Sequence, residues 1–150
     1  MPSLLLATTN NHKLEEVRAV LEPFGLRILG LRDVPGGDAV PEPVEDADSF
    51  EANATLKAAH YARALELVCL ADDSGLEVDA LRGEPGVHSA YYAHGLNDGP
   101  RIPRAERDAA NNRKLLEALR DVPDDERGAR FVCVMIAADP SGTVLAKSWG

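Results

Sequence analysis

Aromatic residues and long apolar runs are scarce in this chain of 150 residues. Aromatic side chains make up 5% of it, against 45% for all hydrophobic residues, so we expect a core built mainly from aliphatic side chains. No apolar run approaches the ~20 residues that a membrane-spanning helix needs. The N-terminus has no basic leader, and its apolar run is too short for a signal peptide. We therefore expect a soluble, cytoplasmic protein without a membrane partner.

Cysteine and positive charge are also limited. Cys69 and Cys133 each lie inside an apolar run, which is typical of small buried side chains in a reducing compartment and not of a disulfide or zinc pair. The 16 Lys and Arg residues against 25 Asp and Glu give a net charge of −9, which argues against a nucleic-acid polymer as partner. A small phosphorylated ligand is compatible with this charge, because it needs only a local group of lysines, backbone N–H groups and a divalent cation.

Apolar patterning predicts a single α/β domain. The expected strands cover residues 4–7, 26–29, 68–71, 76–80, 131–138 and 143–149, and the expected helices cover residues 13–21, 50–67 and 104–119. The unbroken apolar run at 131–138 predicts a central strand covered on both faces, with 143–149 as its hairpin partner. In the last helix, Leu115, Leu116 and Leu119 are expected to face inward. The predicted fold is three-layered, with a long mixed, twisted sheet, helices on its faces and a cleft between two lobes.

Two adjacent carboxylates follow the strand at 68–71. We expect this strand to end at Asp72 and Asp73 and the chain to turn away sharply at Gly75. Neighbouring residues of a strand point to opposite faces, so only one of the pair can point straight into a given site. Carboxylates in this position can hold Mg²⁺ and orient or deprotonate a water. The alternative is an ordinary Asp-rich turn, and this segment alone favours the alternative.

Polar residues separate the first strand from the first helix. They are Thr8, Thr9, Asn10, Asn11, His12 and Lys13. Backbone N–H groups converge at such a junction, and the helix dipole favours an anion there. The threonines and asparagines add side-chain donors, and Lys13 adds a positive charge for phosphate oxygens. The alternative is helix capping by Asn10 or Asn11 with a solvated Lys13; capping and phosphate binding are compatible.

An acidic segment leads into the first turn of the second helix. It contains Glu42, Glu45, Asp46, Asp48 and Glu51. Most of these side chains are expected to be solvated, with Asp48 or Ser49 capping the helix, while one of them reaches a metal under the alternative interpretation. Within the helix, Lys57 lies near the apolar stripe, where it either extends to water or points into a cleft.

Six segments in one order resemble the inosine triphosphate pyrophosphatase family. They are residues 6–13, 50–58, 71–76, 85–90, 112–116 and 130–131. Members of that family hydrolyse non-standard purine nucleoside triphosphates (ITP, dITP and XTP) to the monophosphate and pyrophosphate, which cleanses the nucleotide pool. The resemblance therefore implies a hydrolase of the same kind, with Mg²⁺ as cofactor, and a homodimer.

The same resemblance implies roles for individual residues. The segment from Thr8 to Lys13 would bind the triphosphate, and Lys57 would face a phosphate. Asp73 would be the proton acceptor and a metal contact, with Asp72 beside it and Ser74 touching the substrate. Glu45 would be the second metal ligand.

The chain also departs from the family pattern. Tyr91 stands where the family usually has an arginine, and residues 45–49 lack the usual glycine and threonines. The family continues beyond Gly150 with segments that grip the purine. We therefore expect residues 1–150 to form a C-terminally truncated domain that lacks the base-binding part and leaves a sheet edge exposed. The alternative function is a non-catalytic nucleotide-binding or dimerising fragment.

Overall fold

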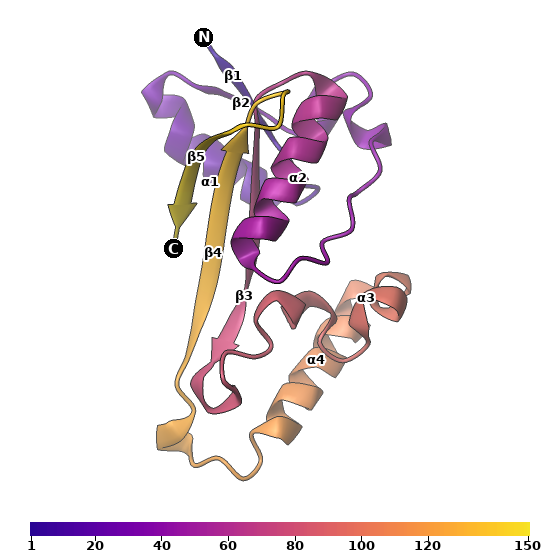
Figure 1. The fold of residues 1–150 in the computed structure, drawn as a ribbon, viewed down its shortest axis with the longest axis vertical. Coiled ribbons are helices and arrows are strands. Elements are labelled where there is room, and N and C mark those ends of the chain that lie inside the picture. Colours follow the sequence, from indigo (N-terminus) through magenta and orange to yellow (C-terminus); the bar gives the residue numbers. More distant parts are fainter. The chain divides into compact units, whose positions relative to one another are not determined.

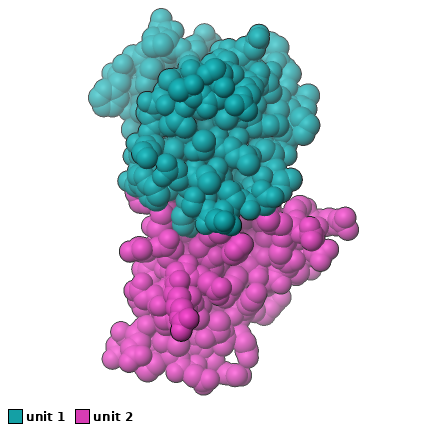
Figure 2. Space-filling model, viewed as in Figure 1, with its two compact units in different colours: residues 1–73, 134–149 teal, residues 74–133, 150 magenta.

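A computed structural model describes residues 1–150, which divide into two compact units (Figure 2). The first unit comprises residues 1–73 and 134–149, and the second comprises residues 74–133 and 150. The helices are α1 (Asn11–Leu21), α2 (Phe50–Leu65), α3 (Gly95–Asp98) and α4 (Arg104–Ala118). The strands are β1 (Ser3–Leu6), β2 (Arg27–Leu29), β3 (Cys69–Val78), β4 (Ala129–Ala138) and β5 (Val144–Trp149). No helix is long and apolar enough to span a membrane.

The strands form one mixed sheet in the order β2-β1-β3-β4-β5 (Figure 1). β1 runs parallel to β2 and to β3, with Leu6 level with Leu70. β4 and β5 form an antiparallel hairpin, as predicted, with Ile136 opposite Lys147. The sheet is open, with β2 and β5 at its edges, and every residue of β5 is exposed. The predicted class, a mixed sheet flanked by helices, is confirmed.

Alternation along the strands supplies apolar side chains to both faces of the sheet. Leu6, Ile28 and Leu70 form one buried cluster, against which the apolar stripe of α1 packs. The opposite face receives α2, whose Ala54 and Ala58 are fully buried. Figure 1 shows α1 behind the strands and α2 in front of them. The first unit is therefore three-layered, because neighbouring residues of each strand serve different helices.

The strand carrying the two aspartates is longer than predicted. β3 does not end at Asp72 and Asp73 but continues to Val78, and Gly75 has no positive φ angle at which the chain would turn. It is β1 that ends early, at Leu6, while β3 retains β4 as its other neighbour. Hydrogen bonding from that remaining side is sufficient to keep the backbone extended through two polar residues.

Two burial predictions are also wrong. β4 is not covered on both faces along its length: Val134 and Ile136 are fully buried, but Phe131 is 81% exposed. The inward stripe of α4 runs through Leu115 to Leu119, the residue that follows the helix, while Leu116 is 61% exposed. Residues four apart share a helix face, whereas the next residue lies about 100° around the helix.

Candidate functional site

The arrangement of β1, β2 and β3 creates a place where a ligand can bind. The three strands are parallel; the chain leaves β1 through α1 to reach β2 on one side, and α2 then leads to β3 on the other side. In open sheets of this kind, ligands bind outside the carboxyl ends of the strands where the order reverses, which here is between β1 and β3. Because β1 ends level with Leu70, Asp72 and Asp73 extend past it at this point.

The segment after β1 caps α1. The Oδ1 atom of Asn10 accepts hydrogen bonds from the backbone N–H groups of His12 (3.0 Å) and Lys13 (3.3 Å). The hydroxyl oxygen of Thr8 accepts one from the N–H of Asn10 (3.1 Å). Asn10 is therefore the cap, and these N–H groups are already engaged by neighbouring side chains. An anion that binds here would replace or share the oxygen of Asn10.

Asp72 and Lys13 form an ion pair between β3 and α1. The Nζ atom of Lys13 lies 2.6 Å from Oδ2 of Asp72, whose side chain is 6% exposed, against 35% for that of Lys13. Asp72 lies two residues after Leu70, on the strand face that packs against α1. The alternative of a merely solvated Lys13 is therefore wrong, because this cation has a buried carboxylate as partner.

Asp73 points to the opposite face, toward α2. Its Oδ2 atom accepts a hydrogen bond from the side-chain Nδ2 of Asn53 (3.1 Å), a residue of α2 that is 1% exposed. The Oδ1 atom of Asn53 in turn accepts a hydrogen bond from the backbone N–H of Ala47 (2.9 Å). No role for Asn53 was predicted from the sequence. The available signal was a polar residue adjacent to the apolar stripe of α2.

A second ion pair joins Lys57 of α2 to Glu45. Their Nζ and Oε1 atoms are 2.8 Å apart, with 19% and 34% of the side chains exposed. Burial by itself lowers the pKa of Lys57, but the hydrogen bond and charge of Glu45, together with the charges of Asp72 and Asp73, raise it above its ordinary value. Lys57 is thus positively charged and within electrostatic range of both aspartates. Two lysines and three carboxylates meet at the β1–β3 position.

This set of side chains suits a hard cation only together with a ligand. No three Asp, Glu, His or Cys side chains are grouped closely enough to hold a metal ion by themselves. Mg²⁺ is commonly held by one or two carboxylates together with phosphate oxygens and waters, and carboxylates are present in Glu45 and Asp73. The donor chemistry therefore fits a cation that arrives with a phosphorylated ligand.

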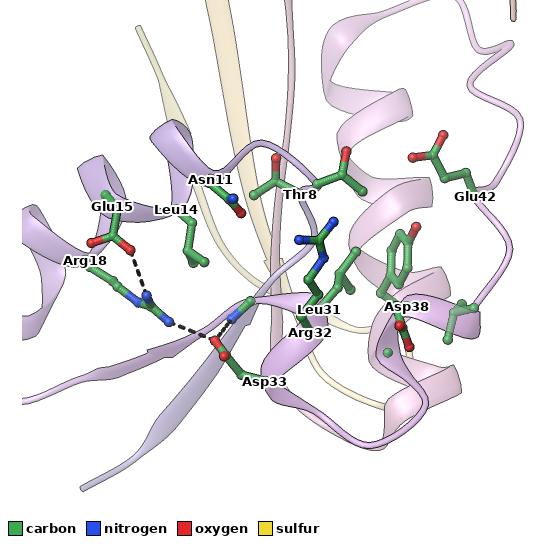
Figure 3. A pocket seen from close by; sticks show the side chains of 15 residues that line it. Thr8, Asn11, Leu14, Glu15, Arg18, Leu31, Arg32, Asp33, Asp38 and Glu42 are labelled. Atoms are coloured by element: carbon green, nitrogen blue, oxygen red, sulfur yellow. Dashed lines mark hydrogen bonds and ion pairs between the residues drawn. The ribbon is translucent and has the colours of Figure 1, made fainter.

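The remaining predicted residues lie at different places. Thr8, Thr9 and Asn11 line a pocket of about 440 Å³ at the ends of β1 and β2 (Figure 3). Arg32 also lines this pocket. His12 is exposed on the first turn of α1, and Ser74 is exposed and belongs to the second unit. Neither Lys13 nor the two aspartates line the pocket. The structure thus brings Lys13, Lys57, Asp72, Asp73 and Glu45 within electrostatic range of one another, whereas Thr8, Thr9 and Asn11 line the pocket.

Comparisons with known proteins agree with the resemblance seen in the sequence. A protein named dITP/XTP pyrophosphatase from Nitratidesulfovibrio vulgaris is 48% identical over 140 residues, covering 93% of this chain and 65% of the relative. One of the same name from Pseudomonas syringae is 48% identical over 153 residues, covering 99% of this chain and 70% of the relative. The chain thus spans about two thirds of the length of these relatives.

Solved structures and a family profile point to the same relatives as the sequence comparison. The crystal structure of a nucleoside-triphosphatase, or dITP/XTP pyrophosphatase, from Mycobacterium abscessus matches with a TM-score of 0.75 and 39% identity, over 99% of this chain and 71% of the other. A HAM1 protein from Coxiella burnetii matches with a TM-score of 0.78 and 33% identity, over 99% and 68%. The profile of the Ham1 family matches residues 4–149. With sequence, fold and family profile in agreement, this chain belongs to the Ham1 family.

Proposed function

We propose that this chain is a nucleoside triphosphate pyrophosphatase that converts non-standard purine nucleoside triphosphates, such as dITP, XTP and ITP, to the monophosphate and pyrophosphate. The observation that carries the proposal is the meeting of Lys13 and Lys57 with Asp72, Asp73 and Glu45 at the β1–β3 position. The names of relatives at up to 49% identity supply the substrate class.

Positive charge from two helices would bind the triphosphate. Lys13 comes from the first turn of α1 and Lys57 from α2, so the two cations would approach the phosphates from different layers. Thr8, Thr9, Asn10, Asn11 and His12 would add hydrogen-bond donors. To reach a phosphate, Lys13 exchanges the carboxylate of Asp72 for a phosphate oxygen. Its side chain is the more exposed of the two partners, at 35% against 6% for that of Asp72.

Asp73 would act as the general base. Its carboxylate accepts the proton of a water whose oxygen attacks the α-phosphorus, while the bond from that phosphorus to the α–β bridging oxygen breaks. The electron pair of the broken bond leaves with pyrophosphate, and the lysines offset the negative charge that develops on it. Glu45 and Asp73 are the residues that would hold Mg²⁺. When bound, Mg²⁺ would supply charge neutralisation at the phosphate oxygens. Asp72 would keep Lys13 in place before the substrate arrives, and Ser74 would contact the substrate.

A turnover assay tests the proposal. The chain is incubated with dITP, XTP or ITP and Mg²⁺, pyrophosphate is measured, and ATP and GTP serve as comparison substrates. We expect turnover that falls by at least about 100-fold in Asp73→Asn. The control is Asp125→Asn, in an exposed turn of the second unit. Equal turnover in Asp73→Asn and the parent chain would rule out Asp73 as the base.

A second candidate function is nucleotide binding without turnover, as in a binding or dimerising fragment. It is favoured by the fact that the chain covers 65% of one relative that carries the enzyme's name. Calorimetry with dITP and light scattering separate the two candidates. Binding by the parent chain with no pyrophosphate release would support the fragment. We also propose a cytoplasmic location and a homodimer, which light scattering would detect as twice the 16.1 kDa chain mass.

A further inference from the structure

Asn53 is an unusual residue for the interior of the first unit. It lies on α2 beside Phe50 and Ala54, and all three are buried. A buried amide that lacks hydrogen-bond partners destabilises a fold. Asn53 instead has a partner for each end of its side chain, and both partners lie outside α2. Its burial therefore links two other parts of the chain to this helix.

The two partners belong to segments that the proposed function uses. The Nδ2 atom donates to the carboxylate of Asp73 on β3 (3.1 Å), and Oδ1 accepts from the N–H of Ala47 (2.9 Å), two residues after Glu45. The side chain itself starts from a fixed point, because the N–H of Asn53 donates to the carbonyl oxygen of Ser49, the cap of α2. One amide group thus bridges β3 and the acidic segment.

We propose that Asn53 is a positioning residue that fixes the orientation of the Asp73 carboxylate and, through Ala47, holds the segment carrying Glu45 at a constant distance from it. This inference rests on the proposed function, which gives Asp73 and Glu45 their roles as general base and metal ligands. Asparagine suits the position because its short side chain both donates and accepts. Aspartate lacks the donor, leucine lacks both groups, and glutamine is one methylene longer.

Two variants separate the two hydrogen bonds. Asn53→Asp keeps an acceptor for Ala47 but puts a carboxylate beside Asp73, whereas Asn53→Leu removes both bonds at similar volume. We expect kcat to fall about 10- to 100-fold in both, as is usual when a residue that orients a ligand is removed, with KM changing less than about 3-fold. Asn112→Asp, in an exposed position of α4, is the matched control and keeps the parent kcat.

Amide hydrogen exchange supplies a readout that does not depend on turnover. In Asn53→Leu, the N–H of Ala47 should exchange at least about 10-fold faster than in the parent chain, while in Asn53→Asp it should keep its hydrogen bond and its protection. All measurements are made below the thermal midpoint of each variant, so that global unfolding does not contribute. If Asn53→Leu does not fold, Asn53→Ser takes its place.

The outcomes distinguish this inference from the proposed function. A parent chain without turnover overturns the proposed function, and the exchange measurement then still decides whether Asn53 holds the acidic segment. Parent-like kcat in Asn53→Asp, or unchanged exchange of the Ala47 N–H in Asn53→Leu, overturns the positioning role. Loss of kcat together with local loss of protection in Asn53→Leu supports it.

Discussion

The ion pair between Lys13 and Asp72 predicts an asymmetric effect on stability. The carboxylate has a 6% exposed side chain and cannot regain water, whereas the lysine is 35% exposed and can turn to solvent. Lys13→Met therefore leaves a buried negative charge without this cation, but Asp72→Asn leaves only a lysine that is easily hydrated. We expect Lys13→Met to be the more destabilising change.

The burial of the two partners sets the magnitude. Removing one partner of a fully buried pair costs about 3–5 kcal/mol, and exposed pairs contribute about 0–1 kcal/mol. With one partner buried and the other one-third exposed, we expect about 2 kcal/mol for Lys13→Met and about 1 kcal/mol for Asp72→Asn. The double variant should be more stable than Lys13→Met alone, because it also replaces the buried carboxylate that has lost Lys13 as its ion-pair partner. The single costs sum to about 3 kcal/mol, so a double variant that costs about 1 kcal/mol corresponds to a coupling of about 2 kcal/mol between the two residues.

Urea unfolding of the four proteins, at low and high salt, measures these free energies. The control is Lys147→Met, which breaks a 3.2 Å pair with Glu51 whose side chains are 57% and 39% exposed. That pair should contribute less than about 0.5 kcal/mol and fade in salt. The reasoning is refuted if Asp72→Asn destabilises the chain as much as Lys13→Met, or if the coupling is absent.

Three further predictions concern residues outside the candidate site. Hydrogen bonds from the hydroxyl of Ser141 and the N–H of Thr143 lower the pKa of Asp139 in the folded chain. The ionised Asp139 carboxylate therefore stabilises the fold above its unfolded pKa of about 3.9, and this stabilisation is lost as pH falls through the lower pKa of the folded state. Acid titration of Asp139→Asn by circular dichroism should show a shallower loss below pH ~4 than the parent. Burial raises the pKa of the Cys69 thiol to about 12. In a Cys133→Ser variant, which removes the partly buried second thiol, Ellman's reagent should label Cys69 only after urea unfolding, and labelling of the folded variant would contradict the full burial of Cys69. The buried side chain of Asn111 forms hydrogen bonds with the backbone of Ala93, Ser89 and Ala90. Asn111→Ala should therefore lower the free energy of unfolding in urea by about 2–4 kcal/mol, and a loss below about 1 kcal/mol would contradict this reasoning.

Local patterns were sufficient for much of the fold. The apolar stripe of α2 was predicted from residues that lie within four positions of one another. Its cap was narrowed to Asp48 or Ser49, of which the structure has Ser49. The cap of α1 was likewise narrowed to Asn10 or Asn11, of which the structure has Asn10, and the hairpin of β4 and β5 was predicted from its turn. These features depend on short-range hydrogen bonds and periodicity, which a sequence carries directly.

Other features depended on neighbours distant in sequence. The strand bearing Asp72 continues because β4 lies beside it, and Phe131 is exposed although its run is as apolar as that of a covered strand. The hydrogen bonds of Asn53 could not be predicted from the sequence either, because its partners Ala47 and Asp73 lie on other segments. An amide within a helix has the same appearance in a sequence whether it meets water or a carboxylate.

The sequence by itself determined the family, the mixed sheet with its helices, and the residue types that gather at the ends of β1 and β3. The tertiary structure alone decided which residue pairs with which: Lys13 with Asp72, Lys57 with Glu45, and Asn53 with Asp73. The physical reason is that pairing depends on which strand face a side chain occupies and on the distance between segments, and these are set only when the sheet has assembled.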